Sequence, residues 1–182
     1  MTANRNRVRI IGGKWRSRLL RFPPAAQLRP TPDRVRETLF NWLGQRLDGL
    51  ACVDLFAGSG ALGFEALSRG AARAVMVDSE RAVAQALRDN AKALEAEGAE
   101  IVHGDAMAYL VGSGGRFDVA FVDAPYASDL ARRAMDRLPP RLKPGARVYV
   151  ESAQPLELGA PWAALREDRA GAVRYALYEM TP

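Results

Sequence analysis

The hydrophobic pattern of this chain repeats one theme from about residue 51 onward. Short apolar runs end in a glycine or an acidic residue, and most are followed by a segment with helical spacing of its apolar positions. Strands are predicted over residues 51–56, 74–78, 101–103, 117–123 and 146–151, and helices over residues 61–68, 81–96 and 130–138. Strands that alternate with helices at this spacing indicate a parallel sheet with helices on both faces. The pattern therefore predicts an α/β fold.

The two ends of the chain depart from this alternation. Residues 7–20 place apolar pairs and cations around a glycine pair, which predicts a small hairpin that presents arginines. A proline-rich connector follows over residues 22–32, and Thr31 suits the N-cap of a helix that extends to about residue 47. Residues 173–180 alternate after Ala170-Gly171, so we expect an antiparallel hairpin at the sheet edge.

Composition excludes several classes of protein. With 182 residues the chain is long enough for one domain with a substantial core and too short for two full domains. One cysteine, Cys52, and one histidine, His103, are too few for a disulfide or a Cys/His metal site, and they are a poor basis for Ser-His-Asp catalysis. No apolar run approaches the roughly 20 residues of a membrane span, and no apolar segment follows the polar first residues. We expect a cytoplasmic protein that needs no metal.

Charge is distributed unevenly. Residues 1–40 hold ten basic and two acidic side chains, a net charge of +8, whereas the remainder holds 16 basic and 19 acidic side chains, a net charge of −3. A basic arm on a mildly acidic body is typical of a protein that binds a polyanion such as a nucleic acid. The alternative is a solvated tail in an arginine-biased chain, since only three of the 26 basic residues are lysine.

A glycine-rich turn is the strongest chemical signal. Gly58, Gly60 and Gly63 follow the first apolar strand and satisfy G-x-G-x-x-G, a spacing that lets the backbone approach a ligand closely. Asp78 lies twenty positions after Gly58, as in a dinucleotide site. Asp54 argues against a dinucleotide, because a carboxylate at the strand end repels a pyrophosphate and suits an ammonium group.

Acidic residues end three consecutive predicted strands. Asp54 ends the first strand, Asp78 the second and Asp105 the third. Asp78 is placed to accept both hydroxyls of a ribose, and Asp105 either accepts from the amine of an adenine or caps a helix. The carboxyl ends of parallel strands meet at one edge of the sheet, where open α/β folds bind ligands.

The fourth strand ends in Asp123-Ala124-Pro125-Tyr126. This tetrapeptide resembles the Asp/Asn-Pro-Pro-Tyr/Phe motif of amino-group methyltransferases that use S-adenosylmethionine. Residues 9–16 (RIIGGKWR) and 28–43 (LRPTPDRVRETLFNWL) resemble one branch of that class, the RsmD family, which methylates N2 of one guanine in bacterial 16S ribosomal RNA. The resemblance extends from about Val8 to the C-terminus.

The resemblance implies a fold, a cofactor and a substrate. The fold is a Rossmann-like class I methyltransferase domain over residues 31–182, with a mostly parallel seven-stranded sheet, an antiparallel edge strand and a basic extension over residues 1–30. The partner is 16S RNA within an assembled or assembling small subunit, and the enzyme is a monomer. Its catalytic residues are Asp123, Ala124, Pro125 and Tyr126. Its S-adenosylmethionine-binding residues are Asp54, Phe56, Gly58, Gly60, Asp78, Asp105 and Ala106. Its RNA-binding residues are Arg9, Lys14, Arg16, Arg18, Arg21 and Arg34.

These residue types suit the transfer of a methyl group to an aromatic amine. The carboxylate of Asp123 and the carbonyl of Ala124 accept the two N–H bonds and aim the nitrogen, while Tyr126 stacks on a flipped base. Ala124 replaces the usual proline of the motif. Pro125 still favours extended backbone at Ala124, so the lost rigidity costs at most roughly 0.4–1 kcal/mol.

Other functions remain open from the sequence. The tetrapeptide also suits methylation of adenine N6 or of a protein glutamine, although 182 residues leave no room for a DNA target-recognition domain. An NAD-linked oxidoreductase would explain the glycines and Asp78 but lacks a substrate domain. An RNA-binding module would explain the basic arm but not the acidic strand ends.

Overall fold

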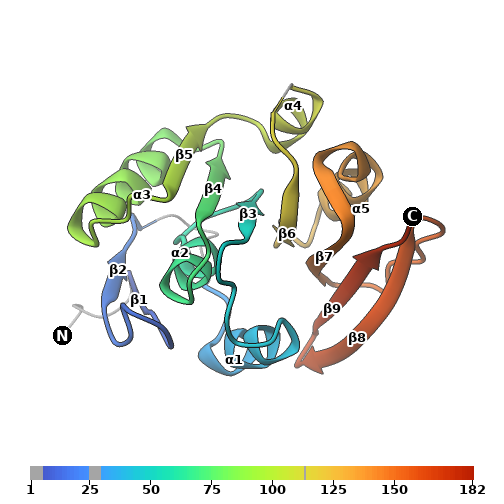
Figure 1. The fold of residues 1–182 in the computed structure, drawn as a ribbon, viewed down its shortest axis with the longest axis horizontal. Coiled ribbons are helices and arrows are strands. Elements are labelled where there is room, and N and C mark those ends of the chain that lie inside the picture. The colour runs from blue at the N-terminus through green and yellow to red at the C-terminus, as the bar shows by residue number, and fades with distance from the viewer. Residues whose placement is uncertain (1–5, 25–29, 113) are drawn as a thin grey trace.

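The computed structural model describes residues 6–24, 30–112 and 114–182, which form a central sheet between two layers of helices (Figure 1). The strands are β1 (Arg7–Arg9), β2 (Leu19–Arg21), β3 (Ala51–Asp54), β4 (Arg73–Asp78), β5 (Ala99–His103), β6 (Phe117–Val122), β7 (Leu142–Ser152), β8 (Trp162–Ala170) and β9 (Val173–Met180). The helices are α1 (Asp33–Trp42), α2 (Ala61–Ser68), α3 (Arg81–Ala93), α4 (Ala106–Val111), α5 (Leu130–Arg137) and a 3-10 turn (Pro139–Arg141). No helix in these ranges is both long and apolar enough to cross a membrane.

The main sheet has seven strands in the order β5-β4-β3-β6-β7-β9-β8. The strands from β5 to β7 are parallel, whereas β9 is antiparallel to both β7 and β8. The chain therefore builds outward from β3 to β5 and then returns to place β6 on the other side of β3. Such a reversal of strand order opens a crevice at the carboxyl ends of the two central strands, where ligands bind. The prediction of a mostly parallel seven-stranded sheet is confirmed.

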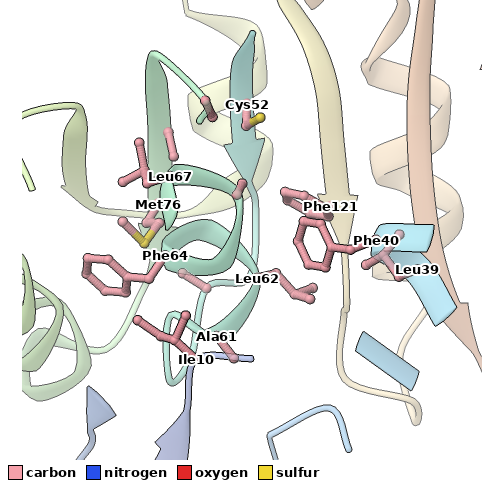
Figure 2. Close-up of a cluster of buried hydrophobic side chains, with 14 of the residues drawn as sticks. Ile10, Leu39, Phe40, Cys52, Ala61, Leu62, Phe64, Leu67, Met76 and Phe121 are labelled. Carbon is pink, nitrogen blue, oxygen red and sulfur yellow. The ribbon is translucent and has the colours of Figure 1, made fainter. Parts of the chain in front are cut away.

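Each face of the sheet has its own apolar core. On one face α1, α2 and α3 cover side chains such as Cys52, Met76 and Phe121, and Figure 2 shows this cluster. On the other face α4 and α5 cover a second cluster that includes Val53 and Val122. Central strands that are buried on both faces need continuous apolar runs, and this need explains the short runs in the sequence.

The predicted hairpin is present as β1 and β2, paired antiparallel with Val8 opposite Leu20. Its apolar residues join the core on the α1–α3 side, and Trp15 is buried there rather than available for stacking on a base. Hydrogen bonds join the hairpin to α2 and α3: Lys14 N–H donates to the Ser68 carbonyl oxygen, and Asn90 Nδ2 donates to the Arg21 carbonyl oxygen. Figure 1 shows β1 and β2 in blue beside these helices.

Two predictions about individual elements are wrong. Helix α1 ends at Trp42 rather than near residue 47, because Gly44 follows with a φ of 96° and breaks the helical path. Thr31 is not its N-cap: Pro32 occupies that position without a side-chain cap, and Thr31 turns its hydroxyl elsewhere. The predicted edge hairpin is present as β8 and β9, although the sequence pattern indicated bounds only for β9 because the exposed β8 has little apolar alternation. The predicted connector over residues 22–32 lies partly outside the described residues, as do Leu28 and Arg29 of the second RsmD-like stretch.

Candidate functional site

The glycine-rich turn joins β3 directly to α2. Gly60 stands at the N-terminus of α2 with a φ of 78°, and a Cβ atom there would lie 2.6 Å from Leu87 and 2.7 Å from Phe64. A residue other than glycine would therefore be both strained and in collision. Gly58 N–H donates to Asp78 Oδ2 at 2.9 Å, so the turn is tied to the end of the neighbouring strand.

Asp54 at the end of β3 is fully buried with only part of its hydrogen-bonding capacity used. Its Oδ2 accepts from Gly63 N–H at 3.2 Å, while its Oδ1 has no partner within the described residues. Burial removes the carboxylate from water and raises the pKa of Asp54 to about 7. An unpartnered buried oxygen is costly unless a ligand supplies a donor, so Asp54 fits the expected ammonium group of a cofactor.

Asp78 and Asp105 end the next two segments. Both oxygens of Asp78 accept backbone N–H groups, from Gly58 and from Glu80, and each keeps a second lone pair for a ribose hydroxyl. Asp105 accepts from Ala108 N–H at 2.8 Å and caps α4, so the helix-cap alternative is the one that the structure contains. Phe56 and Ala106 both contact the core beneath α4 and α5.

The tetrapeptide follows β6, the strand next to β3. Ala124 is buried, while Pro125 and Tyr126 are exposed, and the relative exposure of Tyr126 is 48%. The Tyr126 hydroxyl donates to Glu151 Oε2 at 2.7 Å, so one end of the ring is fixed while much of the ring remains accessible. Burial beside Glu151 and Asp54 raises the pKa of Asp123 well above its ordinary value.

Glu151 is the functional candidate that sequence reasoning missed. It is 2% exposed near the end of β7, where it accepts hydrogen bonds from the hydroxyls of Thr31, Tyr126 and Tyr149. A signal was present, because Glu151 is another acidic residue at the end of a predicted strand. Its three hydroxyl partners come from segments that no sequence pattern joins.

A short series of contacts connects this site to the hairpin. Arg36 is fully buried and donates to the carbonyl oxygens of Thr31 and Arg9, at 3.1 and 2.9 Å. It also forms ion pairs with Asp33 and with the buried Glu65. Arg36 therefore positions the hairpin relative to Thr31 and Asp123.

The expected RNA-binding side chains lie at the surface. Lys14, Arg16, Arg18, Arg21 and Arg34 are exposed. Arg9 is also exposed but pairs with Asp33 at 3.2 Å, and Arg18 donates to the Ala93 carbonyl oxygen on α3. Most of the hairpin's cations therefore face solvent, where a polyanion has access to them.

Comparison with known proteins gives consistent results in sequence and structure. The family model described as "Conserved hypothetical protein 95" matches residues 8–179. The chain is 45% identical over 179 residues to ribosomal RNA small subunit methyltransferase D of Escherichia coli K12, covering 94% of this chain and 89% of that protein. It is 42% identical over 180 residues to the protein of the same name from Haemophilus influenzae, covering 94% and 93%.

Solved structures agree with this result. A putative methyltransferase of Escherichia coli superposes with a TM-score of 0.87 at 45% identity, covering 96% of this chain and 98% of that one. An RNA methyltransferase of Salinibacter ruber in complex with S-adenosyl-L-homocysteine superposes with a TM-score of 0.68 over 84% and 94%, and at 20% identity it shows the fold alone. The class I methyltransferase fold that the sequence predicted is confirmed.

Proposed function

The chain belongs to the conserved hypothetical protein 95 family, which is the RsmD family, and on this premise we propose that it transfers a methyl group from S-adenosylmethionine to the N2 amine of a guanine in small-subunit ribosomal RNA. The observation that carries the proposal is the adjacency of two half-sites. Asp54, whose Oδ1 has no partner within the described residues, ends β3 opposite Phe121 of the paired strand β6, and Asp123 follows Phe121 by two residues.

The cofactor half of the site consists of residues at the ends of β3, β4 and the loop before α4. Asp54 accepts from the cofactor's ammonium group, Asp78 from its ribose, and Phe56 and Ala106 bound the adenine on the side of the second core. Asp105, although it caps α4, lies next to the adenine position. When bound, S-adenosylmethionine supplies an electrophilic methyl group on a positively charged sulfur.

The acceptor half of the site orients a weak nucleophile. The lone pair of guanine N2 is delocalised into the ring, so catalysis rests on alignment more than on activation. Asp123 and the carbonyl of Ala124 accept the amine's N–H bonds, and the exposed ring of Tyr126 stacks on the flipped base. As the N–C bond forms, the S–C electron pair stays on sulfur, and the methylated nitrogen then releases one proton to water.

The basic extension over residues 1–30 contacts the RNA in this proposal. The relatives named above are ribosomal RNA methyltransferases. The hairpin that carries the exposed cations is linked to Thr31 through Arg36, which donates to the carbonyl oxygens of both Arg9 and Thr31. A compact protein of this size reads a presented loop by its shape rather than by a long sequence. We therefore expect a small-subunit particle to be a better substrate than free RNA, with the enzyme acting as a monomer.

Methyl transfer from labelled S-adenosylmethionine tests the proposal directly. The acceptors are small-subunit particles, naked 16S RNA and duplex DNA, each followed by nucleoside analysis. N2-methylguanosine from the particles supports the proposal, whereas N6-methyladenine, or labelled DNA with unlabelled RNA, contradicts it. Asp123→Ala is the matched control. We expect it to lower turnover about 100-fold, because the target amine is no longer oriented, while the affinity for the cofactor stays within a few-fold of wild type.

A further inference from the structure

Glu151 is a buried carboxylate whose hydrogen-bonding capacity is filled by hydroxyl groups. Its Oε1 accepts from Thr31 at 2.9 Å and from Tyr149 at 2.9 Å, and its Oε2 accepts from Tyr126 at 2.7 Å. These donors come from the segment before α1, from β7 itself and from the loop after β6. Three hydrogen bonds from three different segments hold this carboxylate in one orientation.

Thr31 stands between this carboxylate and Asp123. Its Oγ1 lies 2.9 Å from Glu151 Oε1 and 3.2 Å from Asp123 Oδ2. A hydroxyl has one proton and two lone pairs, so it cannot donate fully to both carboxylates. Both contacts become good hydrogen bonds when Asp123 is protonated and donates to Thr31, while Thr31 donates to Glu151.

We propose that Glu151 is a positioning residue whose charge keeps Asp123 as a neutral acid, so that Asp123 presents a carbonyl oxygen to the target amine while the Tyr126 ring is held by its hydroxyl. This inference rests on the proposed function for the identity of the amine. A neutral carboxyl group accepts an N–H bond through its carbonyl oxygen, as an amide does. The hydroxyl of the protonated Asp123 carboxyl group donates to Thr31, and this hydrogen bond keeps the carboxyl group from rotating.

The groups that face Asp123 support this distribution of charge. Asp54 from β3 and Glu151 from β7 are both acidic, and both raise the pKa of Asp123, together with burial. The hydroxyls of Tyr126 and Tyr149 are held by Glu151, and burial beside that carboxylate raises the pKa of both tyrosines, so they remain donors. Arg36 on α1 donates to the Thr31 carbonyl and forms its ion pairs with Asp33 and Glu65.

The first experiment observes the proton without any substrate. The protein is labelled with ¹³C at the aspartate carboxyl carbon, and the Asp123 signal, assigned with Asp123→Asn, is followed through a pH titration. We expect Asp123 to remain protonated well above pH about 3.9, where free aspartate is half ionised. Glu151→Gln removes the charge and keeps the shape, so the Asp123 titration moves to lower pH. Glu157→Gln, in an exposed loop, is the matched control, and we expect it to leave the Asp123 titration unchanged.

The second experiment measures turnover of the same variants. Asp123→Asn keeps the carbonyl oxygen and is expected to retain at least about tenfold more turnover than Asp123→Ala, as for one retained hydrogen bond to a desolvated group. Glu151→Gln lowers kcat with little change in the KM for S-adenosylmethionine, and adding Asp123→Asn to it restores part of the loss. Thr31→Val reproduces the defect of Glu151→Gln, and Thr31→Ser rescues it.

The two experiments separate the inference from the proposed function. An Asp123 signal that titrates like free aspartate, or an Asp123→Asn variant as inactive as Asp123→Ala, overturns the inference. A wild-type protein that holds the Asp123 proton but leaves small-subunit RNA unmethylated overturns the proposed function alone.

Discussion

Asp54, which we propose binds the cofactor's ammonium group, is a buried acid that lowers the stability of the fold once it is ionised. Its pKa in the folded protein, about 7, lies above the ordinary value of 3.8, so the folded state holds the proton more tightly than the unfolded state. The stability that protonated Asp54 contributes is therefore present below pH about 4 and is lost as the pH rises through 7. At higher pH the buried, half-paired charge weakens the fold.

Asp54→Asn tests whether the charge of Asp54 lowers stability and strengthens cofactor binding. The amide keeps an acceptor for Gly63 N–H and carries no charge, so we expect stability at pH 8 to rise, by at most about 4 kcal/mol for a shift of roughly three pKa units. The same variant should bind S-adenosylhomocysteine more weakly, because the ammonium group loses its counter-charge. Denaturant unfolding at pH 5 and pH 8 measures the first effect and calorimetry the second. A variant that is stabilised equally at both pH values would contradict the assignment.

Asp78 carries the predicted ribose contact. Asp78→Ala should weaken S-adenosylhomocysteine binding by about 1.5–3 kcal/mol, as expected for the loss of a charged hydrogen-bond acceptor. It also frees Gly58 N–H, so part of the loss comes from the glycine-rich turn. Asp89→Ala on the exposed side of α3 is the control and should bind as wild type. Tight binding by Asp78→Ala in isothermal titration would show that the ribose lies elsewhere.

At the scale of elements, docking of the hairpin depends on the buried Glu65 of α2. Glu65 accepts from the N–H groups of Ile11 and Gly12, at 2.8 and 2.7 Å, and pairs with Arg69 and Arg36. One carboxylate therefore joins the hairpin turn to two arginines. Removing the Glu65 carboxylate leaves these buried donors without an acceptor. This change lowers the free energy of unfolding far more than the loss of a surface ion pair does.

Glu65→Ala should consequently lower the free energy of unfolding by about 3–5 kcal/mol. The matched control is Asp136→Ala, which breaks the exposed pair with Arg132 on α5 and should cost less than about 0.5 kcal/mol. Urea unfolding measures both. In the milder Glu65→Gln variant, hydrogen exchange at the Ile11 and Gly12 amides should accelerate before the rest of the core. Equal losses in the two alanine variants would mean that apolar contacts alone hold the hairpin.

At the scale of the whole molecule, we propose that the hairpin's charge and the sheet-edge site act together on one RNA substrate. The exposed cations are expected to contact phosphates and release counterions, which makes RNA binding depend on salt. Reversing the charges of Arg16, Arg18 and Arg21 together should raise the KM for RNA and reduce the slope of log K against log salt by about 2. Cofactor binding should be unchanged, because none of the three lies at the sheet edge.

The control for this charge reversal is another trio of exposed arginines. Arg132, Arg133 and Arg137 lie on α5, away from the hairpin, and reversing them changes the net charge by the same amount. If only total charge mattered, the two triple variants would weaken RNA binding equally. A loss confined to the hairpin variant supports a local contact surface.

Prediction from sequence succeeded where short-range pattern controls structure. The parallel strands are apolar because both faces are covered, and Gly58 and Gly60 mark a turn whose backbone has positive φ, so both features are visible in the sequence. The hairpin, the fold class and the family all followed from such local signals. The bounds of β8 in the edge hairpin were not predicted, because this edge strand buries few side chains.

What the sequence by itself determined is the alternation of the parallel strands with most of their helices, the acidic strand ends and the basic arm, because each depends on a residue and its near neighbours. Only the tertiary structure decided which polar groups meet. Thr31 looked like a helix cap and instead joins Glu151 to Asp123, across 120 and 92 positions of the chain. Arg36 belongs to the basic first 40 residues, yet the fold buries it completely. Buried polar groups must find partners wherever the fold places them, and that requirement leaves no periodic trace in the sequence.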